Sequence, residues 1–215
     1  MKRALLCLAA LGAAPLLAQR EYRPFRDYRR HYLSVGAGAA QPGADIKPLL
    51  ANSPLFRFTY GYRFHRYFQA ESGLDSVFYA AKVRDFYESR FGDLRIRDYQ
   101  FMWPSGGRAI VPLAGNKLLL SAGGGGAYLR YQERIRQPFG DSLRLDCPVC
   151  AARSGWGYYG LLGASVALDR AQQLRLGVST RVVRGDTRGD PFGNIPGTTT
   201  KDTWINSAVE FTFSF

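Results

Sequence analysis

The last twelve residues of the chain alternate strictly between two kinds of side chain and end on an aromatic ring. They read WINSAVEFTFSF, and the large apolar groups on one parity are Ile205, Val209, Phe211, Phe213 and Phe215. Successive side chains of a β-strand point to opposite faces, so this pattern predicts a strand with one apolar and one polar face. Chain termini of soluble domains usually fray. An apolar face that reaches the terminal carboxylate therefore needs an apolar partner, either a protein core or lipid.

The other end of the chain has the features of a secretory signal. Lys2 and Arg3 precede an uncharged apolar run, which is followed by a small residue suited to a signal peptidase. The run is too short to be preferred as a membrane anchor. We expect cleavage after Ala18 or Gln19. The expected organisation is a signal peptide at 1–18, a basic tail at 19–30 and one domain at 31–215.

Removal of the signal leaves two cysteines, Cys147 and Cys150, within the segment DCPVCA. In an exported protein a close pair of this kind is most simply a disulfide. A single CxxC is also compatible with half of a zinc site or with a redox motif. No second pair is present, however, and His31 and His65 are far from it in sequence. We therefore expect the two cysteines to be joined.

The composition is basic, with 29 Lys and Arg against 17 Asp and Glu, and a formal net charge of +12. A basic, aromatic-rich chain suggests nucleic-acid binding, but the export signal argues against that class. The one dense basic segment, REYRPFRDYRR at 20–30, is expected to contact anionic lipid headgroups or cell-wall polymer. After the signal no apolar run of about 18 residues occurs, so no transmembrane helix is predicted.

Alternating segments recur along the rest of the chain, with almost no helical periodicity. In residues 55–64, for example, five aromatic side chains share one face, while Arg57 and Arg63 lie on the other. Such segments predict strands of about ten residues with two chemically different faces. The expected strands number eight and cover 31–40, 55–64, 67–78, 95–113, 117–132, 156–168, 174–182 and 204–215.

The segment at 95–113 is the least regular of these. It is long for one strand, and Pro104, Gly106 and Gly107 predict a β-bulge or a change of register within it. The next strand contains four consecutive glycines, 123–126. They lack the GxGxxG spacing of phosphate-binding loops, and we interpret them as a smooth strip beside a bulky neighbour.

The connections indicate how the strands are arranged. Long and short connections alternate along the chain: the long ones cover 41–54, 79–94, 133–155 and 184–200, and the short ones 65–66, 114–116 and 169–173. This order is typical of an up-and-down barrel whose long loops leave one end and whose short turns close the other.

Alternation alone is compatible with two classes of barrel. A soluble barrel of the lipocalin kind would hold the aromatic side chains inside and the charged ones outside. A membrane barrel reverses the two faces and gathers aromatic rings where lipid meets water. The interior of eight strands is only just wide enough to be filled by side chains, so the five aromatic residues of 55–64 would overfill it. We therefore expect the aromatic face to contact lipid.

The charged residues of the strands are then expected to point inward. The expected network comprises Arg57, Arg63, Glu71, Asp75, Arg175, Arg181 and Glu210. If the turn at 65–66 sets the pairing of its strands, Arg57 lies opposite Asp75, and Arg63 lies on the diagonal from Glu71. Arg175 is expected close to Glu210. Paired inward charges predict a closed interior, because buried charges persist only when they are paired.

The signal, the two-faced strands, the order of the connections and the terminal VEFTFSF resemble the small outer-membrane β-barrel proteins of the OmpA and OmpX type. The resemblance covers nearly all of the chain after the signal, although only the terminal motif is specific. It implies an all-β fold: an eight-stranded antiparallel up-and-down transmembrane β-barrel with long extracellular loops and short periplasmic turns. It also implies a C-terminal assembly signal formed by Val209, Phe211, Phe213 and Phe215.

The same resemblance implies a location and a set of partners. The location is the outer membrane of a Gram-negative-type bacterium. The partners are outer-membrane lipids, lipopolysaccharide and the outer-membrane barrel assembly machinery, with no nucleic acid, and the chain is expected to be a monomer.

Some barrels of this type are enzymes, and catalysis there needs a nucleophile and a base near the extracellular rim. His31 and His65 are expected at the opposite end, so we expect no catalytic residue, cofactor or metal site. The sequence favours a non-enzymatic barrel that displays surface loops, with a role in envelope integrity, surface interaction or adhesion. The alternatives are a narrow pore or small-solute channel and, third, a lipid-modifying enzyme.

Overall fold

The computed structural model describes residues 28–48, 50–80, 86–89, 92–136, 146–189 and 199–215. Within these ranges no helix has the length and apolar character needed to cross a membrane. The described residues form nine strands: β1 (His31–Ala44), β2 (Ser53–His65), β3 (Phe68–Phe78), β4 (Phe86–Ser89), β5 (Gly92–Leu113), β6 (Leu118–Arg136), β7 (Asp146–Ala167), β8 (Leu174–Gly189) and β9 (Thr199–Ser214).

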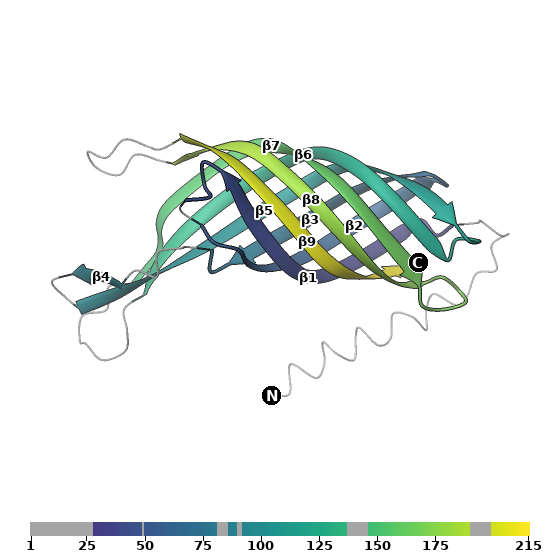
Figure 1. Ribbon diagram of the computed structural model, residues 1–215, viewed down its shortest axis with the longest axis horizontal. Coiled ribbons are helices and arrows are strands. Elements are labelled where there is room, and N and C mark those ends of the chain that lie inside the picture. Colours follow the sequence, from purple (N-terminus) through teal and green to yellow (C-terminus); the bar gives the residue numbers. More distant parts are fainter. Residues whose placement is uncertain (1–27, 49, 81–85, 90–91, 137–145, 190–198) are drawn as a thin grey trace, which may run out of the picture.

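Eight of these strands close into a barrel (Figure 1). Neighbours pair antiparallel in the order β3-β2-β1-β9-β8-β7-β6-β5, and the pairing of β3 with β5 closes the ring. β4 pairs only with β5, beyond the end of β3. The expected all-β, eight-stranded, antiparallel up-and-down barrel is therefore confirmed. Within the described residues, closure gives each of these eight strands a neighbour on both sides, so the ring itself has no open edge.

The two ends of the barrel differ. The turns at 66–67, 114–117 and 168–173 lie at one end, here called the turn end, where the C-terminus also lies (Figure 1). The longer connections leave the opposite, loop end. The strands are longer than expected, because much of each predicted loop pairs as a hairpin arm. β5 and β7 each contain 22 residues, and β7 begins at Asp146, inside the loop predicted at 133–155.

The bulge expected in β5 is absent, and that prediction was wrong. Pro104, Gly106 and Gly107 pair with Ala127, Gly125 and Gly124 in one uninterrupted register. A Cβ atom at Gly106 would lie 2.3 Å from the Gly124 carbonyl oxygen, so the glycines allow close backbone approach without a change of register. The register shifts among the described residues occur elsewhere, between Arg63 and His65 and between Glu133 and Ile135.

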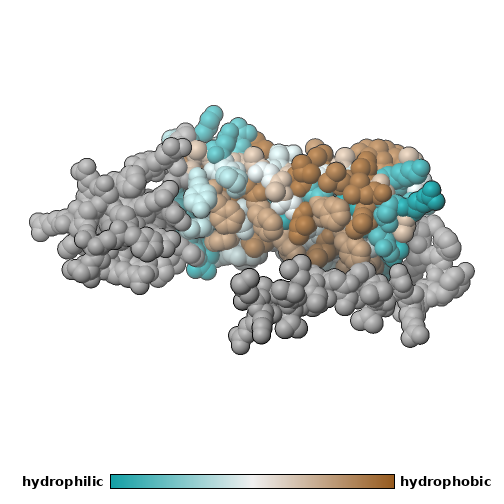
Figure 2. Space-filling view, turned by 90° about the horizontal axis from the view of Figure 1, so that it is seen from below, coloured by the Kyte–Doolittle hydropathy of each residue, from teal (hydrophilic) through white to brown (hydrophobic). Residues whose placement is uncertain are grey.

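The apolar residues at alternate positions of the strands lie on the outer surface of the barrel. Figure 2 shows hydrophobic residues gathered in a broad band on one face, with hydrophilic residues on both sides of it. Leu162, Val178 and Val209 are more than half exposed within this surface. In a soluble protein an apolar patch of this size would be a liability, whereas in a bilayer it is the contact surface for lipid.

Aromatic rings cluster on the outer surface at two heights. Near the turn end, the His31 ring stacks on Phe215, with 5.5 Å between ring centroids. Towards the loop end, Tyr128 lies between Trp103 and Trp156, at 5.7 and 5.0 Å between centroids. Amphipathic rings at two heights are typical of the girdles where lipid meets water.

Candidate functional site

The centre of the barrel interior is organised around Arg57, on β2. Its Nε and Nη2 atoms donate to the two carboxylate oxygens of Asp75, at 2.8 and 3.0 Å. Its Nη1 atom lies 2.9 Å from Glu210 Oε1 on β9 and 2.5 Å from Ser179 Oγ. Arg57 reaches β9 across β1 because the intervening residue is Gly36, which pairs with Arg57 on one side and with Glu210 on the other.

A second group of polar side chains surrounds Glu71, on β3. Arg108 Nη2 of β5 lies 2.6 Å from Glu71 Oε2, and Arg181 Nη2 of β8 lies 3.6 Å from Glu71 Oε1. The hydroxyl groups of Tyr32 and Tyr159 donate to the same carboxylate, at 3.0 and 3.2 Å. The Arg181 guanidinium also lies over the Tyr159 ring, 5.1 Å from its centroid. Strands from opposite sides of the barrel are thereby linked through its interior.

Asp75 joins the two groups into one interior network. Its Oδ1 atom lies 2.7 Å from Arg181 Nη1 and also accepts from Arg57 Nε. The side chains of the six ionic groups are no more than 11% exposed. The network balances three arginines against three carboxylates: Arg57, Arg108 and Arg181 against Glu71, Asp75 and Glu210. Such balance matters because breaking a buried ion pair leaves an uncompensated charge.

Two of the expected partners do not meet. Arg63 is not bound to Glu71; its Nη2 atom donates to the Arg66 carbonyl oxygen at 2.5 Å. Arg175 is not paired with Glu210, because its Nη2 atom bonds carbonyl oxygens at 116 and 117, both at 3.1 Å. Glu210 pairs with Arg57 instead, and Glu71 pairs with Arg108. Those two predicted pairings were therefore wrong, although Arg63 and Arg175 do belong to the inner side of the wall.

Arg108 is the charged residue of the network that the sequence reasoning missed. It shares the inward parity of β5 with Met102 and Ile110, which are both buried. The expected bulge at Pro104 obscured that parity. With an uninterrupted register, Arg108 falls opposite Gln69 of β3, two residues from the position that pairs with Glu71.

A further polar cluster, also missed, fills the interior towards the loop end. Trp204 Nε1 donates to the Tyr131 hydroxyl at 2.7 Å, and both residues are buried. Asp202 accepts from Thr187 at 2.6 Å and from Thr200 at 2.7 Å. The interior is thus occupied by bonded side chains both at its centre and towards its loop end.

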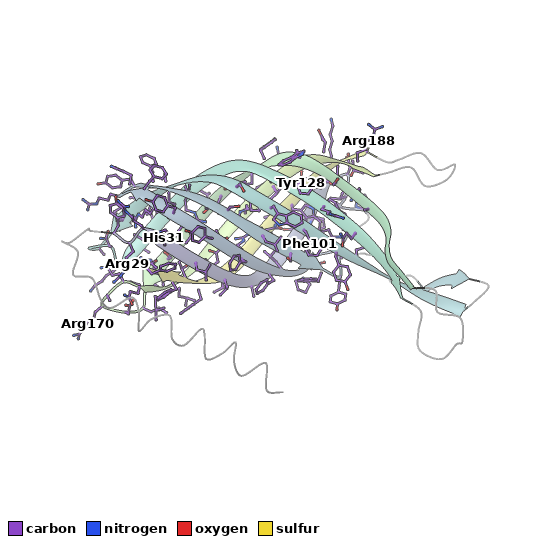
Figure 3. All side chains as sticks on the ribbon, turned by 180° about the vertical axis from the view of Figure 1, so that it is seen from behind. Arg29, His31, Phe101, Tyr128, Arg170 and Arg188 are labelled. Carbon is purple, nitrogen blue, oxygen red and sulfur yellow. The ribbon has the colours of Figure 1, made fainter. Side chains whose placement is uncertain are left out.

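At the turn end the interior opens into a cavity of about 1030 Å³. Residues of the interior network, among them Tyr32, Gln69 and Glu210, form its inner part. Six arginines line it: Arg29, Arg30, Arg63, Arg108, Arg170 and Arg175. Figure 3 shows Arg29, His31 and Arg170 gathered at this end, opposite Arg188.

The turn at 168–173, which contributes Arg170, Ala171 and Gln172 to the cavity lining, is stabilised by Asp169. Asp169 Oδ1 accepts a hydrogen bond from Leu174 N at 2.8 Å. Slight desolvation raises the pKa of the Asp169 carboxyl, but hydrogen bonds from the backbone N–H groups of the turn outweigh it and lower that pKa below its usual value. Asp169 is therefore an ionised carboxylate engaged by its own turn.

The C-terminal segment closes the barrel against β1. His31 N donates to Phe215 O at 3.0 Å, and Phe215 N donates to His31 O at 2.8 Å. Val209 and Phe211 face outward beside Ala37 and Val35 of β1. The side chains of Cys147 and Cys150 lie outside the described residues, as does the signal at 1–18, so the disulfide and the cleavage stay predictions.

Comparison with known proteins bears on the fold. No protein-family model and no curated protein matches the chain. The crystal structure of neisserial surface protein A matches with a TM-score of 0.51 at 12% identity, over 86% of this chain and 97% of that chain. The attachment invasion locus protein Ail of Yersinia pestis matches with a TM-score of 0.47 at 14% identity, over 86% and 99%. A major outer membrane protein of Thermus thermophilus matches with a TM-score of 0.46 at 10% identity, over 86% and 99%.

At this identity the likeness is one of architecture. Neisserial surface protein A and this chain share nearly their whole length, and the pairing of β3 with β5 closes the same kind of ring here. The chain has the closed, eight-stranded, up-and-down fold of the small outer-membrane β-barrels, as its sequence pattern implied.

Proposed function

We propose that the chain is a non-enzymatic outer-membrane barrel with a closed lumen, which displays its long loops at the cell surface and contributes to envelope integrity or surface interaction. The observation that carries the proposal is the contrast between its two faces. An apolar, aromatic-bordered outer surface surrounds an interior of paired charges. The first face suits lipid, and the second holds the strands together without leaving a water-filled path.

The interior network supports a structural rather than a conducting role. Arg57 is bound on three sides, by Asp75, by Glu210 and by the carbonyl oxygen of Asn206. Opening a path through the barrel would require breaking several buried ion pairs together, each of which costs several kcal/mol. The turn-end cavity reaches this network and is lined by members of it.

The positions of the histidines support a non-enzymatic role. The His31 ring contacts Phe215 and Tyr62, and its Nδ1 atom lies 2.8 Å from the Tyr60 hydroxyl. The His65 ring contacts Tyr67 and Phe68 beside the first short turn. Both imidazoles are therefore packed among aromatic rings at the turn end, away from the loop end where a surface hydrolase would hold its substrate.

The partners follow from the same proposal. The apolar band contacts outer-membrane lipid, the loop end faces lipopolysaccharide, and the C-terminal strand is recognised by the barrel assembly machinery. The proposal assigns the chain as a monomer, because each of the eight described strands of the ring is already paired on both sides. Export through a cleaved signal at 1–18 delivers it to that membrane.

A conductance measurement tests the closed lumen. The mature protein, refolded and inserted into planar bilayers, is expected to show no stable channel. A matched pair of variants sharpens the test: Asp75→Ala removes the carboxylate shared by Arg57 and Arg181, whereas Asp186→Ala removes an exposed carboxylate near the loop end. We expect any conductance to come from the Asp75→Ala variant and none from the Asp186→Ala variant. Steady, reproducible channels from the unaltered protein would overturn the proposal in favour of a narrow pore.

A further inference from the structure

The turn-end cavity holds more positive charge than its own carboxylates neutralise. Six arginines and one glutamate line it. That glutamate, Glu210, is already bound to Arg57 and to the hydroxyl groups of Ser179 and Ser34. Arg108 is likewise committed to Glu71. Phe215, which bears the terminal carboxylate of the given sequence, also lines the cavity, so the other five arginines face at most one further negative charge in its lining.

Arg63 and Arg175 are the least exposed of these five. Arg175 is 5% exposed and Arg63 is half-buried. Among the described residues, neither guanidinium group has a carboxylate oxygen within the 4.0 Å of an ion pair. The two arginines act on one another as like charges. Asp169 attracts Arg175 from a distance, but its carboxylate accepts the Leu174 N–H within the turn.

Three guanidinium nitrogens in the cavity lining are buried without a hydrogen-bond partner among the described residues: Arg63 Nε, Arg108 Nε and Arg108 Nη2. The last of these is close to Glu71 Oε2, at the distance of an ion pair. A buried N–H group without a partner has lost its hydrogen bonds to water without replacing them, and the cost is larger when the group is charged. An acceptor of negative charge within this cavity would remove that cost.

The arginines are held ready for such an acceptor. The Arg63 guanidinium lies 5.3 Å from the centroid of the Tyr28 ring, and Arg63 N donates to the Arg30 carbonyl oxygen at 2.6 Å. Arg175 is fixed by carbonyl oxygens of the turn at 114–117 and by Ser165. Pre-ordered guanidinium groups bind the paired oxygens of phosphate with charge-assisted hydrogen bonds, at a low entropic cost.

We propose that the turn-end cavity is a binding site for a phosphate-type oxyanion, held between Arg63 and Arg175 with Arg29, Arg30 and Arg170 at its rim. The oxyanion is supplied either by the headgroup of an anionic phospholipid or by free phosphate, since both present the same paired oxygens. The cavity adjoins the closed lumen and shares Arg108 and Glu210 with its ion-pair network, but the oxyanion is assigned to arginines outside that network. A failure of the conductance test therefore leaves the site standing, and its own failure leaves the closed lumen standing.

Binding of inorganic phosphate to the refolded mature protein tests the site. The protein is placed in phosphatidylcholine nanodiscs at low ionic strength, because salt screens exposed charges, and titrated with phosphate in a calorimeter. The double variant Arg63→Gln/Arg175→Gln is expected to bind at least about tenfold more weakly, a change of about 1.4 kcal/mol. The control, Arg184→Gln/Arg188→Gln, removes two exposed arginines towards the loop end and is expected to bind as the unaltered protein does.

A second arm identifies the source of the oxyanion. Nanodiscs that contain phosphatidylglycerol replace those of phosphatidylcholine, and the unfolding temperature is measured with and without phosphate. If the headgroup occupies the site, phosphatidylglycerol raises the unfolding temperature and suppresses phosphate binding. If free phosphate is the ligand, phosphate binds equally in both lipids. Either result depends on Arg63 and Arg175 and supports the proposal.

Two outcomes would overturn it. One is the absence of binding in both arms. The other is an equal loss in the turn-end and loop-end double variants, which would reduce the effect to overall charge. Arg175 also bonds turn carbonyl oxygens, so the double variant requires a check of folding. Should it not fold, Arg63→Gln alone decides: several-fold weaker binding supports the site, and unchanged affinity refutes it.

Discussion

Arg57 and Asp75 face one another directly across the β2–β3 pair and form a bidentate ion pair, with Nε to Oδ1 at 2.8 Å and Nη2 to Oδ2 at 3.0 Å. Neither residue has measurable exposure to solvent. Asp75 also binds Arg181 and accepts a hydrogen bond from Asn206 Nδ2 at 2.9 Å. One carboxylate thereby connects β3 with three other strands, β2, β8 and β9, across the interior of the barrel.

Replacing Asp75 with Asn should destabilise the barrel, because the change leaves Arg57 and Arg181 with too little negative charge in a buried site. We expect a loss of about 3 to 5 kcal/mol in the free energy of unfolding, measured by urea titration of protein refolded in lipid vesicles. Asp186→Asn, at an exposed position on β8, serves as the control and should change stability by about 0.5 kcal/mol or less. Equal stability of the two variants would show that the network contributes little.

Gly36 is the position over which Arg57 and Glu210 meet. A Cβ atom there would lie 2.8 Å from Glu210 Cγ and 2.8 Å from the Val209 carbonyl oxygen. Gly36→Val should therefore push the ion pair apart and cost about 1 to 3 kcal/mol of overpacking strain. Ala37→Val, at the neighbouring outward-facing position on β1, should fold as stably as the unaltered protein. The same urea titration compares them, and a neutral Gly36→Val would contradict the close contact.

The outward face of β8 gives a test of the lipid contact. Val178 is 58% exposed and lies among the outward-facing apolar residues of this strand. Arginine at this position should lower the free energy of unfolding in a bilayer by about 2 to 4 kcal/mol. Leu168, 55% exposed beside the turn that precedes β8, is a matched control because arginine near the interface costs about 0 to 1 kcal/mol. Gly177 is unsuitable as an inward control, since a Cβ atom there would lie 2.7 Å from the Ala164 carbonyl oxygen. If the Val178→Arg and Leu168→Arg variants have the same free energy of unfolding, this face of β8 does not contact lipid.

Phe215 is expected to act as an assembly signal as well as a lipid contact. Phe215→Ser keeps the backbone hydrogen bonds to His31 and should leave refolding in vitro nearly intact, while most of the protein in cells fails to reach the outer membrane and is degraded. Phe68→Ser removes an aromatic ring of similar exposure, 49% against 47%, outside the C-terminal segment, and should assemble. Membrane fractionation with a gel assay of folding distinguishes the two. Normal membrane levels of Phe215→Ser would count against the signal.

Cys147 and Cys150 are expected to be joined by a disulfide at the loop end. Thiol labelling of protein purified under oxidising conditions should detect reactive sulfur only after reduction. The unfolding temperature of the barrel should change little on reduction, because the closed loop is short and the bridge constrains only the segment before the barrel wall. Two thiols that react before reduction would refute the bridge.

Which residues face which side of the barrel wall can be predicted from the order of residues alone. Alternation with a period of two is a local property of an extended chain, so the outward positions of Phe56, Phe58 and Val209 and the inward positions of Asp75 and Glu210 follow from their order alone. The strand number and the alternation of long and short connections were likewise readable. The length of the hairpin arms was not, because segments without alternation, such as 146–152, form strands only when a neighbouring arm pairs with them.

Which inward charges meet depends on the closed barrel and could not be predicted from the sequence. Inside a closed barrel a long side chain chooses among partners from strands that are distant in sequence, and strand stagger sets their relative heights. Arg57 meets Glu210 because Gly36 leaves room above β1, and Glu71 meets Arg108 because closure brings β5 beside β3. Arg63 and Arg175, which the sequence paired with those two carboxylates, are displaced to the turn-end cavity. Parity is a property of one strand, whereas ion pairing is a property of the closed ring.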